Sequence, residues 1–156
     1  MKVRKDFVTN SSSSSFIIAF ENKEKAQEYF KEKAEIDSIF NIILNDIISS
    51  QPLTKEEAIQ IAKQEYEEEA DFNLFFGNDY KNIFKQKTIT EIIESPEYIE
   101  EKNKIVNTQL QNFSAAIKDK EYLVCLEYED HTEVGAELEN MIMPFLDCVV
   151  DNFNHH

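Results

Sequence analysis

Two strongly apolar segments stand near opposite ends of the chain, and a long stretch with helical periodicity separates them. The first is Phe16–Phe20, which is apolar on both faces and rich in β-branched and aromatic residues. The second is Tyr122–Tyr128, in which every second side chain is apolar, and a third strand is expected within Leu146–Phe153. The sequence therefore predicts an α+β fold, with a small, mostly antiparallel sheet built from both chain ends and several helices inserted between the first two strands.

The stretch between these strands contains clear helix boundaries. Asn22 is placed to cap the first helix, Thr54 and Glu57 have the spacing of a capping box, and Pro96 stands at a third helix start. Phe72–Asn78 is predicted to be an aromatic loop that is either a core plug or an exposed contact site, and the plug is favoured because most large aromatic side chains are buried. The predicted helices cover Lys23–Ile36, Ile39–Ile48, Lys55 to about Ala70, Tyr80–Lys87, Thr90–Glu94, Pro96 to about Lys118, and Val134–Met143.

Composition limits the class of protein. The 156 residues are 42% hydrophobic and include 12 Phe and 6 Tyr, which excludes a disordered chain and predicts one domain over residues 1–156. The sequence has only 2 Gly and 3 Pro, which favours long helices. Cys125 and Cys148 both stand in apolar surroundings and are predicted to be buried free thiols. Without a signal-peptide pattern or a membrane-spanning stretch, a cytoplasmic protein is expected.

The net charge is −15, and the negative charge is unevenly distributed. Residues Glu121–His156 include nine Asp or Glu and no Lys or Arg. Phosphate contacts need a basic surface, so direct binding to nucleic acid is not expected. Such an acidic surface would attract a basic protein partner, although solubility alone is a simpler interpretation of the same charge.

Five consecutive serines, Ser11–Ser15, lead directly into the first strand. A solvated polar lead-in is the simplest interpretation, and anion binding or phosphorylation is the alternative. A serine nucleophile is not indicated, because the chain has no G-x-S-x-G motif to supply oxyanion donors.

The serine run also carries a resemblance. The string F-V-T-N-S-S-S-S-S-F-I, within Val3–Ile18, resembles the opening of a family of small uncharacterised proteins from bacteria and their phages. The resemblance implies no activity and no catalytic residues, but it favours a phage-associated protein.

A second group of polar residues lies near the C-terminus. If both chain ends join one sheet, the serine run comes near this group, which could then hold a small ligand, an anion or a metal. No ligand-spacing motif such as HExxH is present, so we assign no metal, no cofactor and no catalytic residue. The candidate ligand-binding residues are Ser11, Ser12, Ser13, Ser14, Ser15, Asp130, His131 and Glu137.

These observations support three functional hypotheses. The first is a non-enzymatic module that presents an acidic face to a basic, nucleic-acid-binding protein and occludes it, as an anti-CRISPR-like phage inhibitor would. The second is a small enzyme or ligand-binding domain at the serine run, and the third is a homo-oligomer joined through Phe72–Phe76. No membrane association is expected. The predicted acidic face consists of Glu65, Glu67, Glu68, Glu69, Asp71, Glu129, Asp130 and Glu133.

Overall fold

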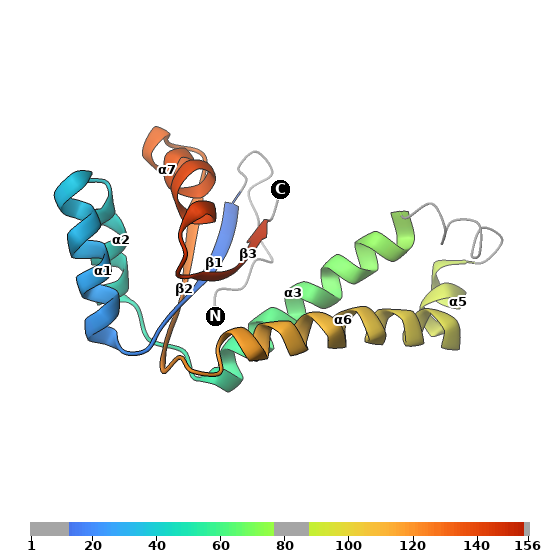
Figure 1. Cartoon of the computed structure of the whole chain (residues 1–156). Helices are drawn as coiled ribbons and strands as arrows, with labels where there is room; N and C mark the ends of the chain where they lie inside the picture. Colours follow the sequence, from blue (N-terminus) through green and yellow to red (C-terminus); the bar gives the residue numbers. More distant parts are fainter. Residues whose placement is uncertain (1–12, 77–87, 155–156) are drawn as a thin grey trace. The chain divides into compact units, whose positions relative to one another are not determined.

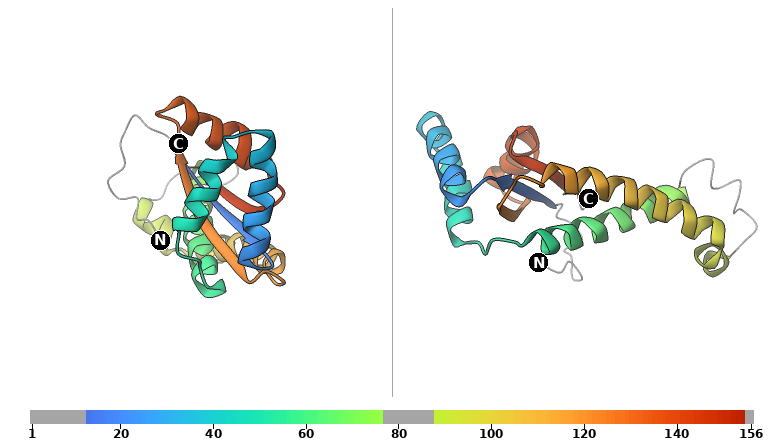
Figure 2. Two further views of the ribbon diagram at one scale, coloured as in Figure 1. Left: turned by 90° about the vertical axis from the view of Figure 1, so that its left-hand side faces the viewer. Right: turned by 60° about the horizontal axis from the view of Figure 1, so that its bottom comes forward.

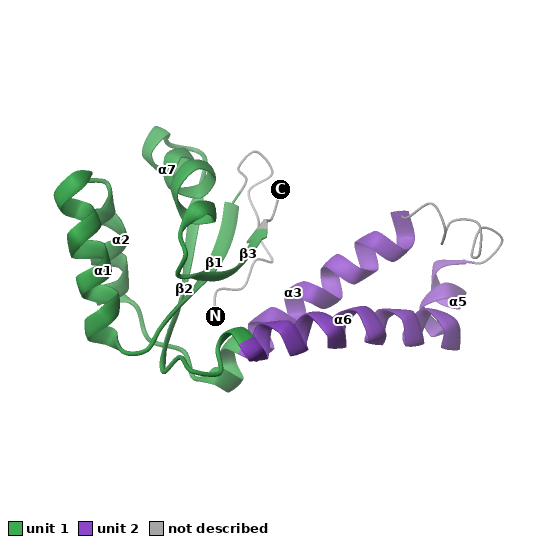
Figure 3. Cartoon of the chain, in the orientation of Figure 1, with its two compact units in different colours: residues 1–58, 116–156 green, residues 59–115 purple. Residues whose placement is uncertain are grey.

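The structure is a computed structural model that describes residues 13–76 and 88–154. The predicted α+β class is confirmed, because a three-stranded antiparallel sheet forms from both chain ends and helices lie between its first two strands (Figure 1). The chain divides into two compact units (Figure 3). Unit 1 contains residues 1–58 and 116–156, and unit 2 contains residues 59–115. That the whole chain acts as one domain stays a prediction.

Unit 1 is built around the sheet, whose strand order is β2-β1-β3. The central strand β1 is Ser13–Phe20, and it pairs with β2, Tyr122–Glu129, on one side and with β3, Val149–Asn154, on the other. The register places Phe16 opposite Leu126 of β2. A bulge interrupts the pairing of β1 with β3, which shifts the register between Ile17 and Ile18. All three predicted strands are present, but β1 begins three residues earlier than predicted, at Ser13, and β3 ends one residue later, at Asn154.

Two helices follow β1. Helix α1, Lys23–Ile36, begins as predicted, with the Asn22 side chain accepting a hydrogen bond from the Lys25 backbone N–H at 2.8 Å. Helix α2, Phe40–Ser49, starts within one residue of its predicted boundary. Figure 2 shows α1 and α2 beside each other on one side of the sheet.

The segment between β2 and β3 departs from the predicted single helix. Helix α7 covers only Glu133–Glu137 and continues as a π-helical turn, η1, over Leu138–Ile142 and a 3-10 turn, η2, over Met143–Phe145. Its start is crowded, since a Cβ atom at Gly135 would overlap the carbonyl oxygen of Glu129. Glycine therefore permits the close turn from β2 into α7.

One hydrophobic core joins these elements of unit 1. It contains side chains from one face of the sheet and from α1, α2, η1 and η2. β1 is buried on both faces from Ser13 to Ala19, as expected for a central strand. The core residues are Phe16, Ile18, Ala26, Phe30, Ile43, Leu44, Ile47, Tyr122, Val124, Leu126, Tyr128, Leu138, Met143 and Cys148.

Three ionisable side chains at this core, Tyr128, Cys148 and Tyr29, have raised pKa values. The Tyr128 hydroxyl donates a hydrogen bond to Asp46 Oδ2 at 2.8 Å, and burial followed by this contact raises the pKa of Tyr128. Burial also raises the pKa of Cys148 to about 12 and that of Tyr29 to about 12. Neither cysteine forms a disulfide, but only Cys148 is buried. The prediction of burial for Cys125 is wrong, because this residue is half-buried on the opposite face of β2.

Unit 2 contains one short helix and the greater part of each of two long helices. These are α3, Lys55–Phe76, α5, Ile89–Glu94, and α6, Pro96–Ala116. Leu74, Ile92 and Tyr98 form its buried cluster, against which Phe75 and Ile105 pack. Both α5 and α6 start at their predicted positions within one residue.

Helix α3 corrects one prediction and confirms another. The capping box is present, with the Thr54 N–H donating to Glu57 Oε1 at 2.9 Å and the Glu57 N–H donating to Thr54 Oγ1 at 3.1 Å. The helix continues to Phe76, so the predicted aromatic loop at Phe72–Asn78 is wrong over its first five residues. The predicted helix Tyr80–Lys87 lies outside the described residues.

None of the helices in the described ranges is long and apolar enough to cross a bilayer.

We predict that unit 1 loses stability as the pH rises from about 8.5 towards 12. Unfolded cysteine and tyrosine ionise near about 8.5 and 10, whereas folded Cys148, Tyr29 and Tyr128 keep their protons to higher pH. Over this window the unfolded state releases more protons than the folded state, so each pH increment favours unfolding. Urea unfolding followed by circular dichroism across the window measures the slope.

The double variant Y29F/C148A is the control for this titration. It should be less stable at neutral pH but should show a shallower decline at alkaline pH, because two of the groups with raised pKa values are gone. A free energy of unfolding that is constant across the window in the wild type would contradict the prediction.

Candidate functional site

Three of the five serines belong to the central strand. Ser13, Ser14 and Ser15 open β1 and are all buried, opposite Glu129, Tyr128 and Glu127 of β2. The interpretation of these serines as a solvated lead-in is therefore wrong, because backbone pairing on both sides draws them into the sheet. Ser11 and Ser12 lie outside the described residues.

Two of the three described serine hydroxyls donate to carboxylates, one on each side of the sheet. Ser14 Oγ donates to Glu139 Oε1 at 3.1 Å, and Ser15 Oγ donates to Glu127 Oε2 at 3.3 Å. Neighbouring side chains of a strand point to opposite faces, so these two contacts lie on different sides of β1. An anion at either position would be repelled by a carboxylate, which disfavours anion binding by Ser14 and Ser15.

The C-terminal candidates lie at the corner after β2. His131 Nδ1 is 3.0 Å from Glu129 Oε2, and Glu129 is opposite Ser13 in the register, so the serine strand and this corner do come together. Asp130 is exposed at the turn, and Glu137 is half-buried in α7. Across residues 13–76 and 88–154, no three His, Cys, Asp or Glu side chains are grouped as a metal site would require.

The predicted acidic run on α3 has an exposed and a half-buried part. Glu68 and Glu69 are exposed, whereas Glu65, Glu67 and Asp71 are half-buried. Immediately after them, Phe72 and Phe76 are each 63% exposed, with their ring centroids 4.8 Å apart. The expectation that these phenylalanines plug the core is therefore wrong, since only Leu74 of this stretch is fully buried.

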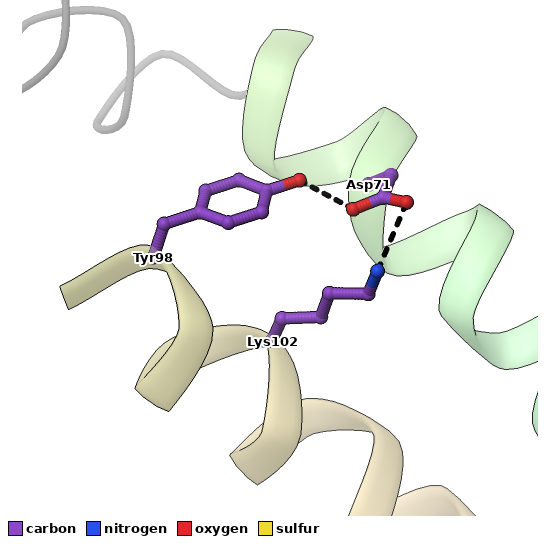
Figure 4. Close-up of polar contacts among 3 residues, drawn as sticks. All are labelled: Asp71, Tyr98 and Lys102. Carbon is purple, nitrogen blue, oxygen red and sulfur yellow. Dashed lines mark hydrogen bonds and ion pairs between the residues drawn. The ribbon is translucent and has the colours of Figure 1, made fainter. Parts of the chain in front are cut away.

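Asp71 connects two helices of unit 2 (Figure 4). The Tyr98 hydroxyl donates a hydrogen bond to Asp71 Oδ1, and Lys102 Nζ lies 3.1 Å from Asp71 Oδ2. Burial, then the contact with Asp71, raises the pKa of Tyr98, so the phenol stays protonated and remains a donor. The Asp71 carboxylate thus joins α3 to α6, and its negative charge is paired with the positive charge of Lys102.

Unit 2 also has a surface depression of about 710 Å³ along α6. Its lining includes the apolar Ile99 together with Glu100 and Lys104, which carry opposite charges. The depression is not the pocket that the ligand-binding hypothesis expects at the serine strand.

Sequence reasoning missed three of these features. Glu139 is only 2% exposed, although its neighbours give no sign that this carboxylate differs from the rest of the acidic segment. Tyr98 and Lys102 are spaced i, i+4 on one helix face, which was a usable signal for a shared partner. The exposure of Phe72 and Phe76 was the less favoured alternative, because the local pattern does not distinguish a core plug from an exposed contact site.

No known protein family, curated protein or solved structure significantly matches this chain. Functional inference therefore depends on the geometry of the described residues.

We predict that Ser14→Ala lowers the free energy of unfolding by about 1–3 kcal/mol. The substitution removes the hydroxyl that donates to the buried Glu139. Chemical denaturation measures the change. Ser49→Ala is the matched control, because that exposed hydroxyl bonds only to nearby backbone carbonyls of α2 and its loss should cost less than about 0.5 kcal/mol. Equal stability of the two variants would contradict the structural role of the serine strand.

We also predict that Tyr98→Phe loosens unit 2. The loss of the donor to Asp71 should raise amide hydrogen exchange in α3 and α6 by an amount equivalent to about 1–3 kcal/mol. Tyr122→Phe is the control, since the Tyr122 hydroxyl is buried without a hydrogen-bond partner in the described part of the chain. That control should be neutral or slightly stabilising. Unchanged amide hydrogen exchange in Tyr98→Phe would show that the contact with Asp71 does not stabilise the packing of α3 against α6.

Proposed function

We propose that this chain is a non-enzymatic protein-binding module that uses the exposed face of α3 in unit 2. One observation carries the proposal: Glu68, Glu69, Phe72 and Phe76 are all exposed at consecutive positions of one helix face. This face joins negative charge to two large apolar side chains. A basic, amphipathic segment of another protein complements both properties.

The helical spacing explains why these four residues share a face. Glu68, Phe72 and Phe76 follow an i, i+4, i+8 row, and Glu69 lies three residues before Phe72. Tyr66, Ala70 and Leu74 lie on the other side of the helix and are buried. The interior of unit 2 therefore fixes which side of α3 is turned outward.

Aromatic anchors and flanking charges have different roles in such an interface. Burying one exposed phenylalanine contributes about 1.5–3 kcal/mol, so the pair can supply most of the affinity. Exposed carboxylates contribute less to affinity, but they orient a basic partner and increase its association rate. Binding should accordingly weaken with salt without being abolished.

The net charge of −15 indicates which partners fit. It disfavours nucleic acid itself and favours proteins whose surface is basic because they bind nucleic acid. Covering such a surface would block nucleic-acid binding by steric and electrostatic occlusion. The resemblance of Val3–Ile18 to openings of phage-associated proteins makes an anti-CRISPR-like inhibitor the concrete form of this proposal.

The alternative function, a small ligand- or anion-binding domain at the serine strand, has weaker support. Ser14 and Ser15 already donate to Glu139 and Glu127. Their burial leaves the hydroxyls poorly accessible to a ligand or a kinase.

A comparison of capture from host lysate tests the proposal. Wild-type chain should retain a basic nucleic-acid-binding protein at low salt and retain less at high salt. F72S/F76S should reduce the affinity of the purified pair at least about tenfold, and E68Q/E69Q should reduce it mainly at low salt. The purified wild type should also displace nucleic acid from that partner in a gel-shift assay.

Matched controls separate this face from general charge and apolar exposure. E28Q/E32Q removes two exposed carboxylates from α1, and Ile36→Ser removes an exposed apolar side chain from the end of the same helix. Neither should affect the interaction. Equal loss of affinity with the controls, or a captured partner that keeps its nucleic acid, would refute the proposed function.

A further inference from the structure

A second amphipathic surface lies on unit 1, in the segment from α7 to η2. Its inner side packs into the core through Leu138 and Met143, and Glu139 is buried beside them. Its outer side exposes Val134, Met141 and Phe145, which are 45%, 70% and 77% exposed. We refer to these three side chains as the outer patch. One short segment thus has apolar residues on both of its sides.

The π-turn explains how the outer patch arises. In a regular α-helix, Val134, Leu138, Met141 and Phe145 would form one stripe at i, i+4, i+7 and i+11, facing the core together. The structure instead has a π-turn at Leu138–Ile142, closed by a bond from the Met143 N–H to the Leu138 carbonyl. The extra residue in this turn changes the helical phase of the residues that follow Leu138, and Met141 and Phe145 are exposed whereas Glu139 is buried.

This arrangement opposes the local sequence pattern. The chain exposes two large apolar side chains that a regular helix would bury, and it buries a carboxylate in their place. Conflicts of this kind between local pattern and tertiary structure concentrate at functional sites, and so do π-turns. Isolated exposed apolar residues are ordinary, but three in one short segment form a patch that needs an explanation.

The charges around the outer patch indicate what covers it. Glu133 is exposed within the segment, Asp130 and Asp147 are exposed just before and after it in the chain, and Glu121–His156 contains no Lys or Arg. Anionic lipid and nucleic acid would be repelled by this rim. A second copy of the chain would bring like charges together. The remaining complementary occupant is a protein segment with apolar anchors flanked by Lys or Arg.

We propose that the outer patch is a second docking surface, which binds a basic amphipathic segment independently of α3. The chain would then engage two such segments, one on each unit. The inference goes beyond the proposed function, and the two can fail separately because the residues belong to different units.

The test uses a defined probe and the full chain. The probe is a synthetic helical peptide of about fourteen residues, with Leu on one face and Lys on the other. Backbone amide shifts in ¹H–¹⁵N spectra should respond to it at residues 133–147 as well as along α3. M141S/F145S should weaken binding at residues 133–147 at least about tenfold and leave the α3 response intact, and F72S/F76S should do the reverse.

Two controls test whether binding depends on the outer patch and on the charge of the peptide. I36S/I48S removes two exposed apolar residues elsewhere in unit 1, at 89% and 54% exposure, and should not change either response. A Leu–Glu peptide should not bind. The proposal is overturned if M141S/F145S binds the Leu–Lys peptide like the wild type, or if the control pair weakens binding equally. It is also overturned if anionic vesicles bind through Phe145, or if M141S/F145S instead changes the sedimentation of the free chain.

Discussion

Strand β1 needs a backbone partner along each edge, and both partners come from the other end of the chain. The strand is buried on both faces, so an unpaired N–H or carbonyl group in it would be costly. β2 and β3 satisfy these groups in antiparallel register. Pairing β1 therefore brings the C-terminal segment beside the N-terminal strand. The position of α1, α2, η1 and η2 against the sheet follows from that pairing, because their apolar side chains complete the core on it.

The serines make this central strand unusual. Three polar side chains at its start are buried, and two of them donate to carboxylates from β2 and η1. A slip of one residue in the pairing would separate Ser15 from Glu127 and turn Phe16 away from the core. The polar contacts at one end of the strand and the apolar contacts at the other thus favour the same register. This consistency explains how a serine-rich strand can occupy the centre of a sheet.

Both units share one surface chemistry although they differ in architecture. On α3 and on the α7 to η2 segment, exposed apolar side chains stand beside exposed carboxylates. The interior explains the orientation in each case: in unit 2 through Leu74 and Tyr98, and in unit 1 through Leu138 and Met143. This shared surface chemistry is the basis of the proposed recognition of basic proteins.

The sequence by itself determined the features that depend on neighbouring residues. Strand periodicity, the caps at Asn22 and Thr54, the start of α6 at Pro96 and the sign of the surface charge all follow from local pattern. Only the tertiary structure decided the burial of Ser13–Ser15 and Glu139, the exposure of Phe72, Phe76 and Phe145, and the contact of Asp71 with Tyr98. Most of these depend on a side chain or strand contributed from far along the chain, as the pairing of Ser14 with Glu139 and of Asp71 with Tyr98 shows. The residues next to each position in the sequence do not specify which distant residue will contact it in the folded chain.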